Sequence, residues 1–407
     1  MATGYNYHLY GDGIHDDYPA IQEMLDAGMQ VVYLPVPEKN YVIGKTLKIH
    51  SRQELRMDAF TRICLADGAN CEMLTNADHI DGNDQVRVVG GIWDMNHNRQ
   101  KSNPYHFPDP DTGKTVWQWM EENNFDREHS KDFPPVYLGF CMIFNDVKRF
   151  YLGDVTIVNP VVYGISLSFI EDFTVENITF EYNEGSPKLW NLDGIHLERY
   201  CKNGYIHNLK GACHDDLIAL TSDDFMPGPI ENIEIDGIFA EGCHSAVRLL
   251  SQVTPVKNVS IKNIFGTFYT YCIIISKYKD FGKGAFENID ISNVYASHCP
   301  GTVDVPGNYS PLIQIGPDLT LKRLTLSNIH RNETRCTTPT IGIKDKSYVK
   351  YLNVYNAEQT NETGTPIPFI GFMGDEGKIE NLTLLDIDTN GDPLISHPEH
   401  VEKIKQV

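Results

Sequence analysis

The most regular feature of the chain is a short unit in which apolar and polar residues alternate. One copy, residues 231–238, reads Glu-Asn-Ile-Glu-Ile-Asp-Gly-Ile. Alternation with a period of two predicts a strand that is buried on one face. The asparagine or aspartate near the end of the unit predicts a tight turn that tolerates left-handed backbone geometry. Further copies occupy residues 176–180, 257–264, 287–294, 322–329, 350–357 and 380–387.

The spacings between copies cluster between 26 and 35 residues. Such self-similarity is typical of a solenoid, in which each rung buries its apolar face against its neighbours. Because the rungs are short strands with almost no helical pattern between them, we predict an all-β fold, a parallel β-helix that forms one domain over residues 1–407. A sandwich would need hairpin turns that the chain lacks, and a propeller blade would need longer units.

Two segments depart from the repeat. The first, residues 18–28, has the pattern of a short amphipathic helix that Asp16 or Asp17 can cap and Gly28 ends, and such a helix would cover the open end of the solenoid. The second, residues 98–134, is polar, aromatic and rich in proline. We predict that it is a long loop inserted near a cleft, because loops of this length usually serve a function.

Composition excludes some classes of function. The chain of 407 residues carries a formal net charge of −21, so it has no surplus of Lys and Arg with which to bind nucleic acid. No apolar run is long enough to span a membrane. The nine cysteines show no paired spacing, which predicts reduced, buried thiols. We expect a cytoplasmic protein, or a secreted or periplasmic one if a signal peptide has been removed. Composition predicts no oligomeric state.

Two aspartate motifs indicate the chemistry. Asn191-Leu-Asp193 is followed, 22 residues after Asp193, by the pair Asp215-Asp216. In a solenoid this spacing places the carboxylates on neighbouring rungs. A rigid cluster of carboxylates can cleave or rearrange a bond between two sugars, because one group protonates the leaving oxygen while another activates water.

Several segments, in order, resemble the motifs of the family 28 glycoside hydrolases, the polygalacturonases and their relatives. The resemblance extends from about residue 8 to residue 300, and it rests on the order and spacing of short motifs. The similar segments are 10–22 (Tyr-Gly-Asp-Gly-Ile-His-Asp-Asp-Tyr-Pro-Ala-Ile-Gln), 90–96 (Gly-Gly-Ile-Trp-Asp-Met-Asn), 159–164 (Asn-Pro-Val-Val-Tyr-Gly), 191–196 (Asn-Leu-Asp-Gly-Ile-His), 214–220 (His-Asp-Asp-Leu-Ile-Ala-Leu) and 243–245 (Cys-His-Ser).

The resemblance implies a right-handed β-helix and hydrolysis with inversion, without metal or cofactor. It implies that Asp215 protonates the leaving oxygen, that Asp193 and Asp216 activate the attacking water, and that His244 hydrogen-bonds the acid. One difficulty follows from strand geometry. Neighbours on a regular strand face opposite sides, so Asp215 and Asp216 share a cleft only if the strand bends or begins there.

Other residues are candidate sugar contacts. Polygalacturonases follow the histidine with an Arg-x-Lys strand that pairs with the uronate carboxylate, whereas the matching strand here places Ile274 and Ser276 at those positions. Arg248, Lys277 and Lys279 are candidate substitutes, although none of them matches the motif residue by residue. For the histidines and aromatic residues a structural role is an equal alternative. The full set of substrate-binding candidates is Asn191, His196, His214, Arg248, Lys277, Tyr163, Trp117 and Trp119.

We therefore predict an inverting glycosidase that acts on pectin-derived or related oligosaccharides, neutral or only partly uronic, and in an exo fashion rather than as an endo-polygalacturonase. One alternative is a polysaccharide lyase or uronate epimerase on the same fold, with Ca²⁺ held by carboxylates. The other is a glycan-binding β-helix without catalytic activity. The adjacent pair Asp223-Asp224 is interpreted as a solvated turn.

Overall fold

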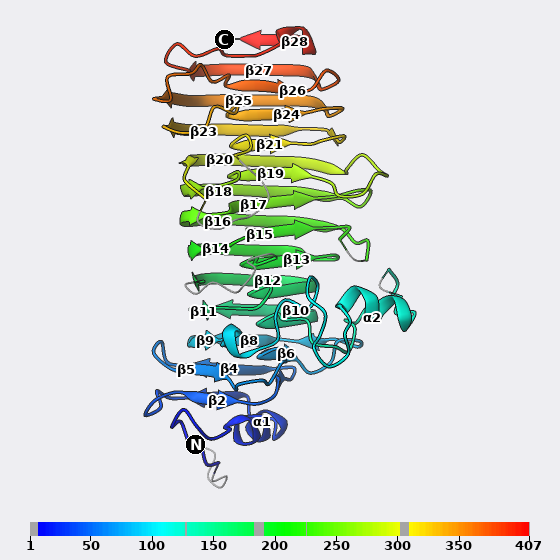
Figure 1. The fold of residues 1–407 in the computed structure, drawn as a ribbon, viewed down its shortest axis with the longest axis vertical. Helices are drawn as coiled ribbons and strands as arrows, with labels where there is room; N and C mark the ends of the chain where they lie inside the picture. Colours follow the sequence, from blue (N-terminus) through cyan, green and yellow to red (C-terminus); the bar gives the residue numbers. More distant parts are fainter. Residues whose placement is uncertain (1–6, 127, 183–190, 225, 302–308, 407) are drawn as a thin grey trace. The chain divides into compact units, whose positions relative to one another are not determined.

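A computed structural model describes residues 7–126, 128–182, 191–224, 226–301 and 309–406. By its internal contacts the chain forms two compact units, Met1–Ile195 and His196–Val407. Within each unit the strands run as stacked rungs and pair in parallel (Figure 1). This architecture confirms the predicted parallel β-helix. That the whole chain is a single domain stays a prediction.

The described part of the first unit carries two α-helices and the strands β1 to β12. Its elements are α1 (Tyr18–Asp26), β1 (Val31–Leu34), β2 (Tyr41–Ile43), β3 (Leu47–Ile49), β4 (Gln53–Met57), β5 (Arg62–Leu65), β6 (Leu74–Asn76), β7 (Asn83–Asp84), β8 (Val86–Val89), β9 (Ile92–Asp94), the 3-10 turn His97–Arg99, α2 (Val116–Glu122), β10 (Met142–Gly153), β11 (Thr156–Val158) and β12 (Ile165–Glu181).

The second unit is itself built of rungs. Its elements are β13 (Ile195–Glu198), which begins at the boundary, β14 (Lys202–Ala212), β15 (Asp216–Thr221), β16 (Ile230–Cys243), β17 (Ser245–Leu250), β18 (Val256–Phe268), β19 (Ile273–Ser276), β20 (Phe286–His298), β21 (Ile313–Ile315), β22 (Thr320–Leu321), β23 (Leu324–Glu333), β24 (Ile341–Lys344), β25 (Tyr348–Asn361), β26 (Ile370–Met373), β27 (Lys378–Asp388), the 3-10 turn Pro398–His400 and β28 (Val401–Gln406).

The alternating repeat builds the core of the second unit. Its apolar positions face inward and stack in register, so that Ile233 pairs with Val259, Val259 with Ile289, and Ile289 with Leu324. These four side chains are buried. Burial of each contributes about 1.5–3 kcal/mol, and this explains why the repeat specifies its own stacking.

The asparagines of the repeat form a ladder of their own. Asn263, Asn293 and Asn328 all have left-handed backbone geometry, which confirms the prediction from the sequence. Each donates a hydrogen bond from its side chain to the residue one rung earlier: Asn293 to Asn263 at 2.9 Å and Asn328 to Asn293 at 2.8 Å. The turn residue therefore holds both the local backbone and the register between rungs.

Helix α1 confirms the predicted N-terminal helix, and it packs on β1 and β3. The backbone N–H of Tyr18, the first residue of the helix, donates a hydrogen bond to Oδ1 of Asp16 at 2.9 Å. Asp17 instead accepts N–H groups from Tyr10, at 2.6 Å, and from Val42, at 3.2 Å. Asp16 therefore caps the helix, whereas Asp17 joins the N-terminal segment to β2.

The segment 98–134 differs from the predicted loop because it contains α2. This helix begins with a capping box, in which Thr115 accepts the N–H of Gln118 and the Gln118 side chain accepts the N–H of Thr115. The Thr-x-x-Gln spacing was visible in the sequence, but a helix of seven residues leaves almost no periodic signal.

The cysteines and the helices of the structure bear on two predictions from composition. All nine cysteines are free thiols, and most are buried, which confirms the prediction of reduced cysteines. Among the described residues, no helix has both the length and the apolar character needed to cross a membrane.

Candidate active site

The paired aspartates lie where a strand begins. Strand β15 starts at Asp216, and Asp215 precedes it, so the two side chains are not bound by the alternation of a regular strand. His244 likewise precedes β17, whose first residue Ser245 pairs in register with Asp216. The difficulty raised by strand geometry is therefore resolved: the strand begins at the site, and both carboxyl groups reach it.

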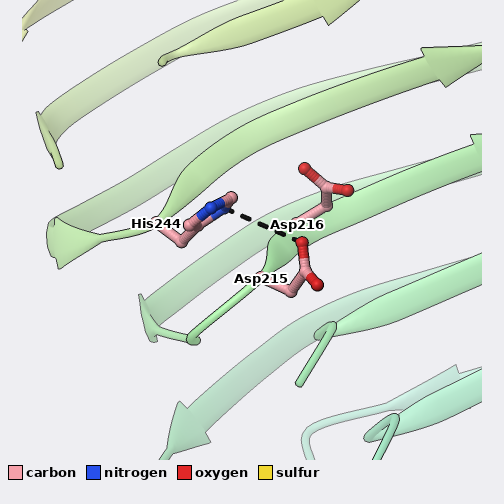
Figure 2. Close-up of side chains that lie close together, drawn as sticks. All are labelled: Asp215, Asp216 and His244. Atoms are coloured by element: carbon pink, nitrogen blue, oxygen red, sulfur yellow. Dashed lines mark ion pairs between the residues drawn. The ribbon is translucent and has the colours of Figure 1, made fainter. Parts of the chain in front are cut away.

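Asp215, Asp216 and His244 come together in the second unit (Figure 2). One donor atom from each residue lies within 4.8 Å of those of the other two. The Nδ1 atom of His244 is 3.8 Å from Oδ1 of Asp215. The two carboxyl groups differ in their surroundings, because the Asp215 side chain is 24% exposed whereas that of Asp216 is 4% exposed.

Asp216 is held by neighbouring side chains of the second unit. Ser245 donates its hydroxyl to Oδ1 at 2.5 Å, and the Tyr271 hydroxyl donates to the same oxygen at 3.3 Å. The Nε of Arg248 forms a charge-assisted hydrogen bond with Oδ2. A buried carboxylate needs such partners, and here they also fix its orientation.

Arg248 is the central cation of this site. Its Nη2 donates to the Tyr271 hydroxyl at 2.6 Å, its Nη1 donates to the Tyr278 hydroxyl at 2.5 Å, and Nη2 is 3.9 Å from Oδ1 of Asp215. Burial alone would lower the pKa of Arg248, but the charge of Asp216 and the neighbouring tyrosines raise it well above its usual range. The guanidinium therefore stays charged and bridges the two aspartates.

Two tyrosines enclose His244. The rings of Tyr269 and Tyr271 meet the imidazole edge-on, with centroids 5.3 and 5.5 Å away. Burial raises the pKa of Tyr271 well above its usual range, so its hydroxyl remains a hydrogen-bond donor. His244 Nδ1 is buried and has no hydrogen-bond partner in the described part of the chain. The imidazole faces the Asp215 carboxyl group (Figure 2).

The three residues could also hold a metal ion. Two carboxylates and an imidazole suit a divalent cation in type and in spacing. Arg248 already contacts Asp216, however, and its positive charge opposes a second cation at the same oxygens. The charge balance of the site thus favours chemistry by the side chains themselves.

The sequence-predicted residues of the first unit have varied surroundings. Asp193 is buried near the end of this unit, and its main-chain carbonyl accepts the Tyr182 hydroxyl at 2.9 Å. Asn191 Oδ1 is 2.5 Å from His106 Nε2. Tyr163 is buried and stacks on Phe140, with ring centroids 4.5 Å apart. That Asp193 and Asn191 join the Asp215 cluster stays a prediction.

The two tryptophans that we predicted as substrate contacts, Trp117 and Trp119, lie on α2. Trp117 is 48% exposed and meets the ring of Tyr105 at 5.6 Å, edge to face. Trp119 is less exposed and lies 6.1 Å from the ring of Phe125. Trp117 therefore presents more surface to a ligand than Trp119 or the buried Tyr163 does.

In the second unit, several candidates have structural contacts. His196 Nε2 is 3.0 Å from the Thr221 hydroxyl, and His214 Nδ1 is 3.5 Å from the Tyr269 hydroxyl. The Lys277 side chain is 6% exposed, and its Nζ contacts Asp318 at 2.6 Å. The Lys277 ammonium is thus already paired, which favours a structural role over the substrate binding that we predicted.

The interpretation of Asp223 as part of a solvated turn is wrong. Asp223 is buried, and its Oδ2 accepts the N–H groups of residues 252–254 at 2.7, 2.9 and 2.8 Å. The carboxylate organises the turn that follows β17. This role depends on a loop 30 residues away, and the sequence around Asp223 carries no sign of it.

Sequence reasoning missed two partners of Asp216. Ser245 and Tyr271 were not predicted as site residues. Ser245 begins β17, one rung after Asp216, and Tyr271 lies two residues before β19, on the rung after that. Equivalent positions on successive rungs face the same side of a β-helix. Polar residues at these positions are the signal that could have found them.

Comparison with known proteins supports the fold. No protein-family model matches the chain, and no curated protein sequence matches it. Among solved structures, an exopolygalacturonase from Thermotoga maritima is similar at 15% identity and a TM-score of 0.61, with 93% of this chain and 90% of that chain covered. The chain therefore has the polygalacturonase-like parallel β-helix fold.

Proteins of other function share this fold. The surface adhesin PfbA of Streptococcus pneumoniae is similar at 15% identity and a TM-score of 0.57, with 98% of this chain and 99% of that chain covered. The mannuronan C-5 epimerase AlgE4 A-module of Azotobacter vinelandii is similar at 14% identity and a TM-score of 0.53, with 96% of both chains covered. At such identities the likeness concerns the fold alone, and function has to be argued from the site.

Proposed function

We propose that the chain is an inverting glycoside hydrolase that acts on pectin-derived or related oligosaccharides. One observation carries the proposal: two adjacent carboxyl groups have different surroundings. Asp216 is buried against Arg248, whereas Asp215 is partly exposed and faces His244. Glycoside hydrolysis needs one carboxyl that gives a proton and another that accepts one, and unequal environments separate these roles.

In this proposal Asp215 protonates the leaving glycosidic oxygen. Asp216, oriented by Ser245 and Arg248, takes a proton from the attacking water, and Asp193 assists it. His244 positions the acid through its contact with Asp215. The role of Asp193 rests on its motif, which resembles that of the polygalacturonases.

The pairing of Arg248 and Lys277 with carboxylates of the protein supports a neutral or only partly uronic substrate. A uronate carboxylate is best bound by an unpaired Arg or Lys. Arg248 is hydrogen-bonded to Asp216 and two tyrosines, and Lys277 is paired with Asp318. Both of these cations are therefore already paired with a carboxylate of the protein. We further propose exo action, with the inserted segment 98–134 limiting the length of substrate that enters.

The test measures reducing-sugar release from pectic oligosaccharides, rhamnogalacturonan and neutral aryl α-glycosides. The variant is Asp215→Asn, and the matched control is Asp290→Asn, an exposed aspartate on β20. We expect turnover that persists in EDTA, a kcat lowered about 100- to 10,000-fold by Asp215→Asn, and no change in the control. Product lengths from oligosaccharides of defined size distinguish exo from endo action.

Other outcomes of this test would indicate a different function for the protein. An unsaturated, ultraviolet-absorbing product, or activity lost in EDTA, would indicate a lyase or epimerase that holds a cation between Asp215, Asp216 and His244. Binding of the same glycans without turnover would indicate a non-catalytic β-helix. Equal activity in Asp215→Asn and wild type would refute the proposed acid.

A further inference from the structure

An exposed tyrosine lies next to the candidate active site. Tyr278, two residues after the end of β19, is 59% exposed. Its hydroxyl accepts a hydrogen bond from Nη1 of Arg248 at 2.5 Å. The same guanidinium bonds Oδ2 of Asp216 through Nε, and its Nη2 is 3.9 Å from Oδ1 of Asp215. One side chain, that of Arg248, therefore connects Tyr278 with both carboxyl groups.

Tyr278 is held in place through its backbone as well as through its hydroxyl. Its N–H donates to Oε1 of Gln252 at 2.9 Å, and Gln252 is almost fully buried. The same oxygen accepts the N–H of Lys279 at 3.2 Å, and the Gln252 carbonyl accepts the N–H of Gly284 at 2.8 Å. The loop between β19 and β20 is thereby fixed to the turn that follows β17. A ring held in this way loses little conformational entropy when a ligand packs against it.

The surface that Tyr278 exposes is largely apolar. Its hydroxyl is bonded to Arg248, whose guanidinium carbon lies 5.4 Å from the ring centroid. Because the ring makes up most of the surface of a tyrosine, an exposure of 59% leaves much of this ring in contact with solvent. Phe281 on the same loop is 55% exposed, and Val253 on the turn after β17 is 56% exposed. A concentration of large exposed apolar residues indicates a binding surface.

We propose that Tyr278 is a substrate-binding residue whose ring packs against a pyranose unit beside the bond that is cleaved. This inference rests on the proposed hydrolase activity. A glycosidic oxygen placed at Asp215 carries a sugar on each side, and Arg248 and Tyr278 are the next groups beyond the carboxyl pair. A pyranose has an apolar face of C–H groups, which suits an aromatic ring. Such a contact needs no charge on the ligand, as a neutral or only partly uronic substrate requires.

The test compares Tyr278→Ala, which removes the ring, with Tyr278→Phe, which keeps the ring and removes the hydroxyl. The matched control is Tyr205→Ala, which removes a tyrosine of similar exposure, 51%, from β14. The probes are pectic and rhamnogalacturonan oligosaccharides of defined length. Steady-state kinetics give kcat and KM. Calorimetry gives the Kd of the same oligosaccharides, with Asp215→Asn in every protein so that turnover does not interfere.

We expect Tyr278→Ala to raise KM and Kd about tenfold and to change kcat less than about threefold, because binding shared by the ground state and the transition state appears in KM. Tyr278→Phe should raise KM and Kd by less than Tyr278→Ala does, and Tyr205→Ala should change neither. Unchanged KM and Kd in Tyr278→Ala would overturn the proposal. A lowered kcat at unchanged KM in both Tyr278 variants would also overturn it, because Tyr278 would then act only by positioning Arg248.

The two readouts separate this proposal from that of the hydrolase. Absence of turnover, together with glycan binding that weakens in Tyr278→Ala, would refute the hydrolase and support glycan binding by Tyr278. Turnover that depends on Asp215 and is insensitive to Tyr278→Ala would support the hydrolase and overturn the role of Tyr278. Absence of both turnover and binding would overturn both proposals.

Discussion

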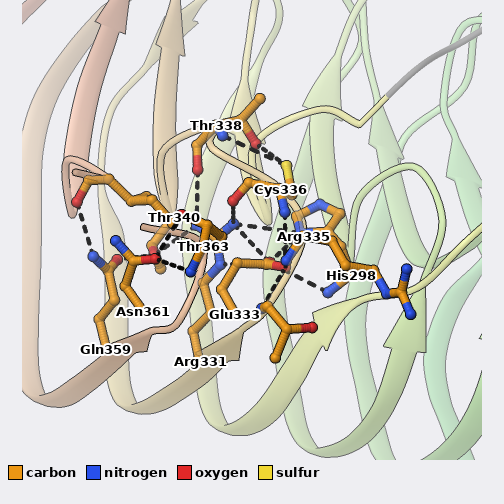
Figure 3. A network of polar contacts seen from close by, with 12 residues as sticks. His298, Arg331, Glu333, Arg335, Cys336, Thr338, Thr340, Gln359, Asn361 and Thr363 are labelled. Atoms are coloured by element: carbon orange, nitrogen blue, oxygen red, sulfur yellow. Dashed lines mark hydrogen bonds and ion pairs between the residues drawn. The ribbon is translucent and has the colours of Figure 1, made fainter. Parts of the chain in front are cut away.

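Replacing Glu333 with glutamine tests how the C-terminal rungs are held together. Glu333 ends β23 and is fully buried in a polar network (Figure 3). Its Oε2 contacts Arg331 Nη2 and His298 Nδ1, each at 2.8 Å. Its Oε1 accepts the N–H groups of residues 334–336 at 3.1, 3.0 and 3.0 Å. The carboxylate therefore joins β20, β23 and the turn that follows.

The contribution of Glu333 to the folding free energy follows from the pKa of its carboxyl group. Burial raises it, but the contact with His298, the charge of Arg331 and the backbone N–H groups together lower the pKa of Glu333 from 4.5 to about 2. At about 1.36 kcal/mol per pKa unit, this difference corresponds to about 3 kcal/mol of folding free energy. Loss of one partner from a buried pair costs about 3–5 kcal/mol, which agrees.

The sign of the pH dependence follows as well. Because the pKa of Glu333 is lowered on folding, its contribution is present above pH 4.5 and is lost as the pH falls toward 2. His298 acts in the opposite direction. Burial lowers its pKa, but contacts with Cys336 and Glu333 raise it above 6.5, so its contribution is present below pH 6.5 and declines as the pH rises beyond that.

The assay is hydrogen exchange measured by mass spectrometry, because the rungs of a solenoid can open separately. We expect Glu333→Gln to lower protection of β20, β23 and β25 on the order of 100-fold at neutral pH, and less below pH 4.5. The control is Glu287→Gln, whose side chain is 45% exposed and pairs with Lys322 at 3.4 Å. Equal effects of the two substitutions would refute the reasoning.

Three further predictions concern the site and its support. Arg248→Met should lower kcat about 100-fold with little change in KM, and Arg248→Lys should restore part of it, because the guanidinium orients Asp216; a raised KM at unchanged kcat would instead show that Arg248 binds substrate. Asp223→Ala should cost about 2–3 kcal/mol, seen as faster exchange at residues 252–254, and unchanged exchange there would contradict its role. Prolonged dialysis against EDTA should leave kcat unchanged, and recovery of lost activity by Ca²⁺ alone would contradict the charge argument from Arg248.

The sequence by itself determined the fold and pointed to the carboxylate pair. Alternation within each repeat decides which side chains face inward, and this is a property of a few consecutive residues, as the stacked Ile233 and Val259 show. The positions of Asp215, Asp216 and His244 at the starts of neighbouring strands also follow from the repeat spacing. Helix α1 was visible because its apolar positions recur within one short segment.

Only the tertiary structure decided which partner each polar side chain takes. Arg248 pairs with Asp216, and Lys277 pairs with Asp318. Asp223 accepts hydrogen bonds from a loop on the next rung. The partners are separated by about 30 to 40 residues in the chain. Their meeting depends on register between rungs and on loop paths, and neither leaves a local pattern. The periodic core could therefore be predicted from the sequence, whereas the electrostatics of the site required the assembled rungs.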